Sequence, residues 1–352
     1  MTDELELNKL LFRLSDIYNT EEIFFDNSIG ETLIGKLILN RVVNIAYRNL
    51  MKSGAGLGEF SRPLKLMFED NLRRGEECMA NIEHVCRVFK DADFPFALLK
   101  GAYLIPFLYE TGDRLSNDID VLVNESNVGK CQKLLLENGF RQGYVNGGVF
   151  REATRREVIM SKMNYGETIP FVKNLEGHFI MVDINFSVDY KPMEDDGIIT
   201  RMLEKRVSLP LNDTTLVTLD PSDFLIHLCL HLYKEATTWD WVMRRKDLNL
   251  YKFNDIYLLM RRNGSREFME QLAFRIRDYG VEKECYFALF NTMIIYGFLN
   301  SMDGYREFLD GIRPEDTGYM KEIVNPIEKT VYRYDTEFLE WFSCNDRLLK
   351  LL

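Results

Sequence analysis

The chain has 352 residues, and its 55 Asp and Glu residues outnumber its 44 Lys and Arg residues, so its formal net charge is −11. Because 46% of the residues are hydrophobic and 12% are aromatic, the chain can build packed cores, which excludes a wholly disordered protein. The acidic balance disfavours proteins that coat nucleic acids or anionic membranes, since binding many phosphates takes a basic surface.

The sequence shows no targeting or membrane-spanning signal. Its first residues, MTDELELNKLLF, lack the basic and then apolar pattern of a signal peptide. The most apolar stretch, Phe94–Tyr109, is interrupted by Lys100 and is too short to cross a bilayer. The six cysteines form no CxxC pair, which disfavours a zinc site or a disulfide framework. We therefore expect a reduced, soluble, cytoplasmic protein.

The N-terminal part has helical periodicity. From Asp3 to about Lys90, apolar residues recur every three or four positions, as in amphipathic helices. The glycine-rich stretch Ser53–Gly58 predicts a break, after which a helix is expected from Pro63 to Phe89.

The middle part alternates short strands with helices. Strands are expected at Phe96–Leu99, Asp118–Val123 and Phe179–Val188, and helices at Ala102–Tyr109 and Ser126–Asn138, with Ser126 as the N-cap of the second. The stretch Gly147–Pro170 is predicted only as a helix or a hairpin with loops. This order of elements predicts an α+β unit with a small mixed sheet.

The C-terminal part begins with a helix signal, because Asp220 suits an N-cap and Pro221 the first helical position. Helical periodicity then dominates to Leu352, with breaks near Asn263–Gly264 and Arg313–Pro314. We predict three parts: an N-terminal helical region over 1–92, an α+β core over 93–211 and a C-terminal helical domain over 212–352.

Three acidic residues are the main candidates for chemistry. Asp118 and Asp120 alternate along a predicted strand, so both carboxylates project from the same face. Asp183 lies in another predicted strand among apolar residues, where a carboxylate is costly to bury unless it is paired or binds a metal. Carboxylate oxygens suit Mg²⁺, and three of them together are typical of two-metal phosphoryl transfer. The alternative for the Asp118–Asp120 pair alone is two solvent-facing acids at a strand edge.

Cationic and glycine residues stand next to these acids. Lys100 and Gly101 end the first predicted strand and begin a helix, and a helix N-terminus with a glycine favours a bound phosphate. Arg114 precedes Asp118 by four residues and is suited to a bidentate phosphate contact. A surface ion pair is the ordinary alternative for such an arginine.

These motifs resemble a known family. The stretch FALLKGAYLIPFLYETGDRLSNDIDVLV followed by VDINF is similar to the DNA polymerase beta-type nucleotidyltransferase superfamily, and within it to the uncharacterised nucleotidyltransferases. The resemblance covers roughly Phe96–Ser187 and extends to helices of the Asp220–Met260 stretch. The sequence departs from the superfamily in two respects. The superfamily usually has Gly-Gly or Gly-Ser where this chain has Gly101-Ala102, and the spacing from there to Asp118 is longer than usual.

The resemblance implies a Mg²⁺-dependent transfer of a nucleoside monophosphate from an NTP to an acceptor, with release of pyrophosphate. It implies that Asp118 and Asp120 hold two metal ions with the triphosphate. It also implies that Asp183 completes the second metal site and helps to deprotonate the acceptor. Lys100, Gly101 and Arg114 would bind the phosphates.

Other residues are weaker candidates. His227 and His231 share one helix face and suit either a metal or core hydrogen bonding, of which the second is favoured because apolar residues surround them. Two basic clusters suit an anionic ligand, although a solvated helix face is the commoner role; they are Arg151, Arg155 and Arg156, and Arg244, Arg245 and Lys246. The pair Trp239 and Trp241 suits a base or acceptor pocket, although helix packing is the commoner role.

The leading prediction is thus an NTP-dependent transferase acting on a small molecule or a protein, without a membrane partner. Two alternatives remain. One is a nucleotidyltransferase-like binding or antitoxin partner without turnover, and the other is nucleotidyl transfer to tRNA or another nucleic acid. The acidic net charge disfavours the latter.

Overall fold

The computed structural model describes residues 2–24, 26–164, 168–175, 177–188, 197–344 and 346–351. The chain divides into two compact units, one formed by Arg74–His227 and the other by Met1–Arg73 together with Leu228–Leu352. Two helices, α4 (Ser61–Phe89) and α9 (Pro221–Ala236), contribute turns to both units. The boundaries expected near residues 92 and 211 stay predictions.

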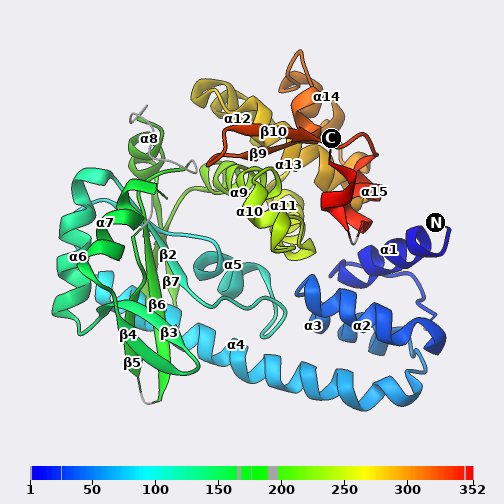
Figure 1. Ribbon diagram of the computed structural model, residues 1–352, viewed down its shortest axis with the longest axis horizontal. Coiled ribbons are helices and arrows are strands. Elements are labelled where there is room, and N and C mark those ends of the chain that lie inside the picture. The colour runs from blue at the N-terminus through cyan, green and yellow to red at the C-terminus, as the bar shows by residue number, and fades with distance from the viewer. Residues whose placement is uncertain are drawn as a thin grey trace. The chain divides into compact units, whose positions relative to one another are not determined.

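The Arg74–His227 unit is built on a six-stranded mixed sheet (Figure 1). Its strand order is β1-β2-β6-β5-β3-β4, in which β2 and β6 are parallel and the other neighbours antiparallel. The strands are β1 (Phe96–Leu98), β2 (Ile119–Val123), β3 (Arg141–Asn146), β4 (Val149–Glu152), β5 (Phe171–Leu175) and β6 (His178–Asn185). The prediction of an α+β fold with a small mixed sheet is confirmed.

The two faces of the central strands differ in polarity. In the parallel β2–β6 pair, Ile119 is paired with Val182 and Val121 with Ile184, so one face is aliphatic. The C-terminal half of α4 supplies part of the core of this unit, and its last residue, Phe89, lies 4.9 Å from the ring of Phe96 on β1. Burial of these aliphatic side chains therefore fixes which face of β2 and β6 packs against the core. The residues between them, which include Asp120 and Asp183, lie on the other face.

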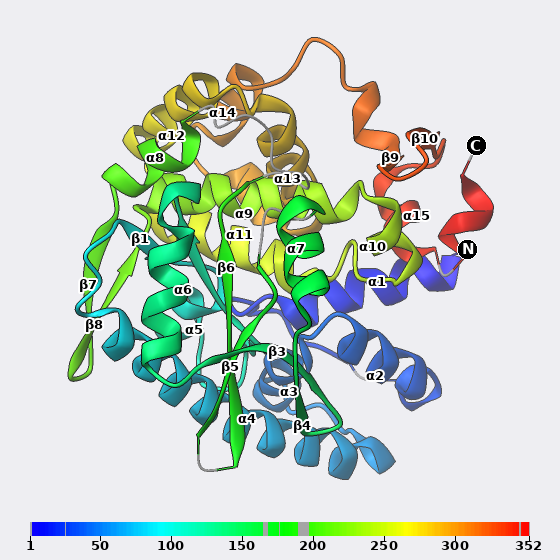
Figure 2. The same ribbon diagram turned by 60° about the vertical axis from the view of Figure 1, so that its left-hand side comes forward.

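Further elements complete this unit. A separate hairpin of β7 (Val207–Leu211) and β8 (Thr214–Thr218) lies beside β1 (Figure 2), where Thr218 Oγ1 donates to the Leu98 carbonyl at 2.7 Å. The helices are α5 (Gly101–Leu108), α6 (Val128–Glu137), α7 (Arg155–Asn164) and α8 (Ile198–Glu204). Asp220 caps α9 as predicted, because its Oδ1 accepts from the Ser222 N–H at 2.9 Å.

The second unit is mostly helical. Its helices are α1 (Thr2–Ser15), α2 (Gly30–Leu39), α3 (Val43–Lys52), α10 (Trp239–Met243), α11 (Leu250–Asn263), α12 (Arg266–Tyr279), α13 (Glu282–Ile295), α14 (Tyr305–Gly311) and α15 (Phe338–Ser343). Buried hydrogen bonds join segments far apart in sequence: Ser15 Oγ lies 2.9 Å from the Tyr296 hydroxyl, and the Asn254 amide donates to the Ser15 carbonyl at 3.2 Å. None of the helices in the described ranges is long and apolar enough to cross a membrane.

Several sequence predictions of local structure are confirmed. The break after Lys52 is present, α4 ends at Phe89, and α11 ends at Asn263. The stretch Gly147–Pro170, expected to be a helix or a hairpin with loops, contains β4 and α7. β4 forms a hairpin with β3, which lies before this stretch, and residues 165–167 lie outside the described residues.

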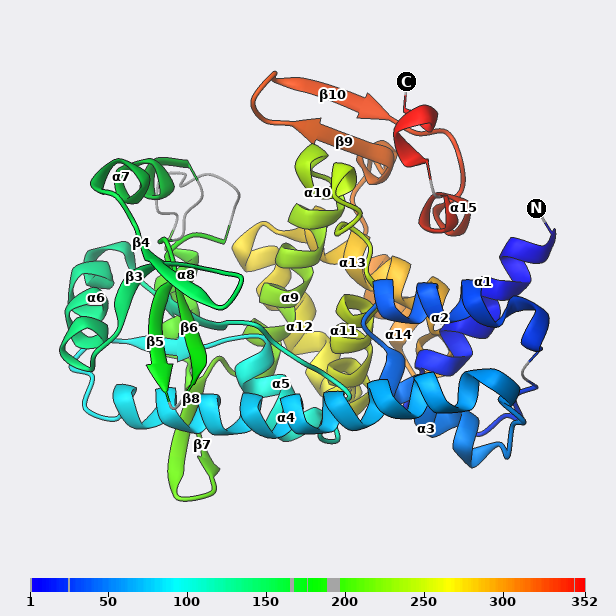
Figure 3. The same ribbon diagram turned by 60° about the horizontal axis from the view of Figure 1, so that its bottom comes forward.

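Two local predictions are wrong. Ser126 does not cap α6, because it lies inside a 3₁₀ turn (Glu125–Asn127) and Asn127 precedes the helix. The C-terminal part is not wholly helical, since β9 (Glu322–Asn325) and β10 (Thr330–Arg333) form a hairpin (Figure 3). Its turn is stabilised by Asn325, whose Oδ1 accepts from the N–H groups of Ile327 and Glu328 at 3.1 and 3.2 Å.

Candidate active site

Sheet register brings the predicted acidic residues to one place. Asp120 on β2 is the direct pairing partner of Asp183 on β6, so both side chains leave the same face of neighbouring parallel strands. Asp118 immediately precedes β2 and lies two residues from Asp120, on the same side. Three carboxylates from two adjacent strands therefore share one edge of the sheet, as the sequence predicted.

Asp120 is held by two nitrogen donors. Lys100 Nζ contacts Asp120 Oδ1 at 2.8 Å, and the amide of Asn185 donates to the same oxygen at 3.1 Å. The Asp120 side chain is 7% exposed and that of Lys100 is 20% exposed. These charge-assisted contacts offset the free-energy cost of burying the carboxylate.

Lys100 has an unusual backbone conformation. It joins β1 to α5 with φ 47° and ψ −119°, a region in which a β-carbon is crowded and glycine is favoured. Non-glycine residues in such regions cost of order 1–3 kcal/mol and are concentrated at functional sites. The strand-to-helix turn therefore directs a lysine side chain toward Asp120 at a cost to local stability.

Gly101 begins α5 and lies against Ser116. A β-carbon at Gly101 would meet Ser116 Cβ at 2.8 Å and Oγ at 2.9 Å. The Ser116 hydroxyl donates to Asp118 Oδ1 at 3.3 Å, and the Cys78 thiol donates to the Ser116 carbonyl at 3.3 Å. The missing side chain of Gly101 thus allows the close approach that positions Ser116 beside Asp118.

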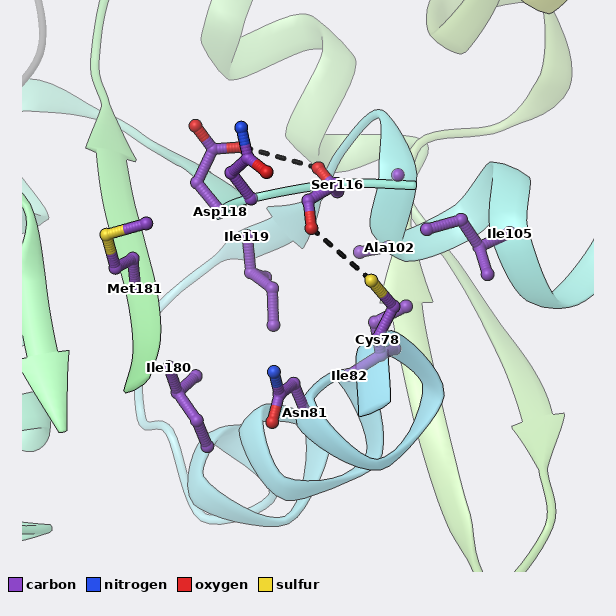
Figure 4. A pocket seen from close by; sticks show the side chains of 12 residues that line it. Cys78, Asn81, Ile82, Ala102, Ile105, Ser116, Asp118, Ile119, Ile180 and Met181 are labelled. Atoms are coloured by element: carbon purple, nitrogen blue, oxygen red, sulfur yellow. Dashed lines mark hydrogen bonds between the residues drawn. The ribbon is translucent and has the colours of Figure 1, made fainter. Parts of the chain in front are cut away.

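A small cavity borders this contact on the aliphatic side of the sheet (Figure 4). Its volume is about 20 Å³, enough for about one water molecule. The lining comes from α4, the start of α5, the segment before β2, and β6, and includes Cys78, Asn81, Ile82, Gly101, Ile105, Ser116, Asp118, Ile119, Ile180 and Met181. Its size excludes a nucleotide.

We expect Gly101→Ala to lower the stability of the protein by about 1–3 kcal/mol, because the new methyl group displaces Ser116. Urea-induced unfolding measures this change. Gly129→Ala in α6 is the matched control: no atom lies within 4 Å of the added carbon, so this variant should be neutral or more stable by up to about 1 kcal/mol. Equal stability of both variants would contradict the close contact.

Asp118 has a perturbed acidity. Burial, followed by the neighbouring Asp120 carboxylate, raises the pKa of the Asp118 carboxyl above its ordinary value of 3.8. The positive charges of Lys100 and Arg114 and the Ser116 hydroxyl act in the opposite direction and lower this pKa. An ionised Asp118 is thus an unfavourable charge in the folded protein.

The raised pKa of Asp118 predicts how this residue changes the folding stability with pH. Because the folded-state pKa is raised, ionised Asp118 lowers the folding stability above that pKa, and this penalty is gone below pH 3.8. Asp118→Asn should therefore raise Tm at pH 7, and the gain should vanish as the pH falls below 3.8. Thermal unfolding across this pH range measures the effect.

Asp120→Asn is the comparison variant and should have the opposite sign at pH 7. It removes the charge partner of Lys100, which we expect to cost about 1–3 kcal/mol. If Asp118→Asn also destabilised the protein at pH 7, the assigned charge environment of Asp118 would be wrong.

Arg114 lies close to these acids. It is 7% exposed, its Nη1 donates to the Leu115 carbonyl, and its charge acts on Asp118. The predicted site residues Lys100, Gly101 and Arg114 thus all lie near the acidic cluster, and Lys100 contacts it directly.

Sequence reasoning did not select two residues of this site, Ser116 and Asn185. Strand alternation could have indicated Asn185, which lies two positions after Asp183 and so on the same face. Nothing in the sequence pattern distinguishes Ser116, because its position depends on its contact with Gly101.

A family model matches most of the chain. Residues 31–297 match the model of a family described as uncharacterised nucleotidyltransferase. The chain belongs to this nucleotidyltransferase family. No curated protein matches the sequence. Among solved structures, the chain is similar to an antigenic nucleotidyltransferase-like protein from Paracoccidioides brasiliensis, with 14% identity and a TM-score of 0.34 over 58% of this chain and 88% of that one.

In this member of the family, the donor set for a metal fits only in part. Carboxylate oxygens are suitable ligands for Mg²⁺. In the described ranges, however, no group of three or more His, Cys, Asp and Glu side chains is placed to hold one metal ion. Asp120 Oδ1 already accepts from two nitrogen atoms. The two-ion arrangement implied by the resemblance stays a prediction.

The two histidines of α9 differ in their surroundings. His231 Nε2 lies 3.5 Å from Glu235 Oε2, and Glu235 also pairs with Lys252. His227 is buried on the same helix. The interpretation as core hydrogen bonding stays a prediction.

The other weak candidates have contacts of ordinary kinds. Arg151 forms a surface ion pair with Glu157 at 2.8 Å, and Arg245 Nη1 donates to the Cys344 carbonyl at 3.0 Å. Trp239 stacks on Tyr332 with ring centres 4.7 Å apart. All six cysteines are free thiols.

Proposed function

We propose that the protein transfers a nucleoside monophosphate from an NTP to a small-molecule or protein acceptor, with Mg²⁺ and with release of pyrophosphate. The observation that supports this most is the register pairing of Asp120 with Asp183, with Asp118 beside them, in a chain of the nucleotidyltransferase family. Bound Mg²⁺ would neutralise negative charge on the triphosphate.

The residues would act as follows. Asp118, Asp120 and Asp183 supply the oxygen ligands, and Asp183 accepts the proton of the acceptor hydroxyl, since it leaves the same face as Asp120. Gly101, which the resemblance implies at the phosphate site, is buried against Ser116 beside Asp118, and Arg114 adds positive charge there. Lys100 is placed to contact a phosphate that lies next to Asp120.

We infer the class of the acceptor from the net charge of the chain. The net charge of −11 opposes the approach of a polynucleotide, so we favour a small molecule or a protein side chain as acceptor. We propose that the reaction occurs in the cytoplasm, where NTP and Mg²⁺ are available.

A second candidate function is a non-catalytic nucleotidyltransferase-like partner protein. One observation favours it: the Lys100 ammonium already compensates the charge of Asp120. A protein that kept the fold as a binding surface would retain such a contact without metal or nucleotide.

The test is label transfer. The purified protein is incubated with each of the four α-³²P-labelled NTPs, Mg²⁺ and cell extract, and label is followed in the protein, small-molecule and nucleic-acid fractions. We expect ribonuclease-resistant label on a protein or a small molecule. Ribonuclease-sensitive label would assign a nucleic-acid acceptor, and a stable stoichiometric protein partner with no label transfer would favour the non-catalytic function.

A further inference from the structure

The mostly helical unit contains a cavity of about 470 Å³, built entirely from its Leu228–Leu352 part. Protein interiors leave few voids larger than a water molecule, whereas cavities that bind small molecules measure about 300–1,000 Å³. The lining comes from α13, the 3₁₀ turn Gly318–Lys321, the residue after β10 and the start of α15. Its aliphatic and aromatic members are Phe290, Ile294, Met320, Tyr334, Phe338 and Leu339.

The aromatic side chains of the wall are held in place by their own contacts. Tyr334 stacks on Trp341 with ring centres 4.1 Å apart, and its hydroxyl donates to the Met320 carbonyl at 3.0 Å. The ring centre of Phe338 lies 6.0 Å from that of Phe253 on α11. Rings that are already fixed lose little conformational freedom when a ligand binds, so this wall is preorganised for an aromatic partner.

A buried amide group interrupts the apolar lining. Asn291 on α13 lines the cavity and is 1% exposed. Within the described part of the chain, no hydrogen bond to or from its side chain is found. A buried amide without a hydrogen bond is costly, and this group can both donate and accept. A ligand with its own donor and acceptor would supply the missing partners.

The charged side chains of the lining compensate each other. Among the described lining residues these are Lys321 and Glu337, and Lys321 Nζ lies 3.1 Å from Glu337 Oε1. The Glu337 side chain is 89% exposed, which places this ion pair at the solvent side of the cavity. An ionised ligand would lose its hydration without meeting an unpaired opposite charge. The cavity therefore favours an uncharged ligand.

We propose that this cavity binds an uncharged aromatic small molecule whose amide or similar donor–acceptor group pairs with Asn291. Most of the lining residues follow the range 31–297 that matches the family model, so the family match does not indicate this ligand. The unit also does not contain Asp118, Asp120 or Asp183. Binding of such a molecule therefore does not depend on the proposed transferase function.

The test compares three probes that share one ring system, naphthamide, naphthoate and naphthylmethylammonium, by isothermal titration calorimetry without nucleotide. Wild type should bind naphthamide with a Kd below about 1 mM and the two charged probes at least about tenfold more weakly, because their charges lose water on entry. No binding of naphthamide by wild type would overturn the proposal. Equal affinity for either charged probe would overturn the assignment of an uncharged ligand.

Two Ile→Trp variants locate the bound probe. Ile294→Trp adds a bulky ring to the cavity wall and should abolish naphthamide binding. Ile327→Trp is the matched control, since Ile327 is 77% exposed in the β9–β10 turn, and it should bind naphthamide as wild type does. Circular dichroism checks that both variants fold. Naphthamide binding by folded Ile294→Trp with wild-type affinity would place the probe elsewhere and overturn the proposal.

A third variant tests the amide contact. Asn291→Leu keeps a side chain of similar size but cannot form hydrogen bonds, so it should bind naphthamide about fivefold more weakly or worse. Unchanged naphthamide affinity in this variant would overturn the role of Asn291. Because these titrations contain no NTP and no metal, their failure leaves the proposed transferase function untouched, and a failure of label transfer leaves this binding site untouched.

Discussion

Asp183→Asn is expected to lower the rate of nucleotidyl transfer by at least about 10²–10³-fold, because it removes a charge that acts on the reacting groups. Asn has nearly the same shape as Asp, so β6 and its pairing with β2 should remain intact. The rate of label transfer from the NTP measures the loss, and circular dichroism checks the fold.

Asp93→Asn is the matched control for this experiment. Asp93 is an exposed acid of the same unit that pairs with Lys130 at 3.3 Å, so its replacement should leave the transfer rate unchanged. A transfer rate for Asp183→Asn within threefold of wild type would exclude Asp183 from the reacting groups.

The largest effect on stability is expected in the helical unit, at a buried ion pair. Arg347 and Asp247 contact each other with side chains that are 5% and 1% exposed. Arg347 also donates from Nε to the Trp341 carbonyl at 3.0 Å and from Nη2 to the Phe342 carbonyl at 2.8 Å. Arg347→Met should therefore cost about 3–5 kcal/mol, because it leaves a buried carboxylate without its cation.

Guanidinium-induced unfolding measures this cost, and a double variant provides the control. Asp247→Leu combined with Arg347→Met removes both charges and should recover more than half of the lost stability. If the double variant were less stable than Arg347→Met alone, the loss would come from packing and not from the unpaired charge.

The sequence predicted the elements whose residues are strongly patterned. β1, β2 and β6 are short apolar runs with clear ends, and each is found within a few residues of its expected position. β3 was missed because its residues, RQGYVN, are half-exposed and lack a regular alternation. The β9–β10 hairpin was missed although Asn325-Pro326 is a turn signal.

The sequence predicted that the acidic residues lie together, but not which contacts they make. Strand alternation is enough to place Asp118 and Asp120 on one face. The pairing of Asp120 with Asp183 depends on which strands become neighbours, and the sequence does not specify this. The contact of Lys100 with Asp120 depends on a backbone turn with positive φ at a lysine, which residue preferences argue against.

The most direct test of the account is isothermal titration calorimetry of the four nonhydrolysable NTP analogues, with and without Mg²⁺, against wild type and Asp118→Ala/Asp120→Ala. We predict Mg²⁺-dependent binding of at least one analogue by wild type, and its loss in the double variant. Binding of equal affinity by both proteins would contradict the assignment of these carboxylates to the nucleotide site.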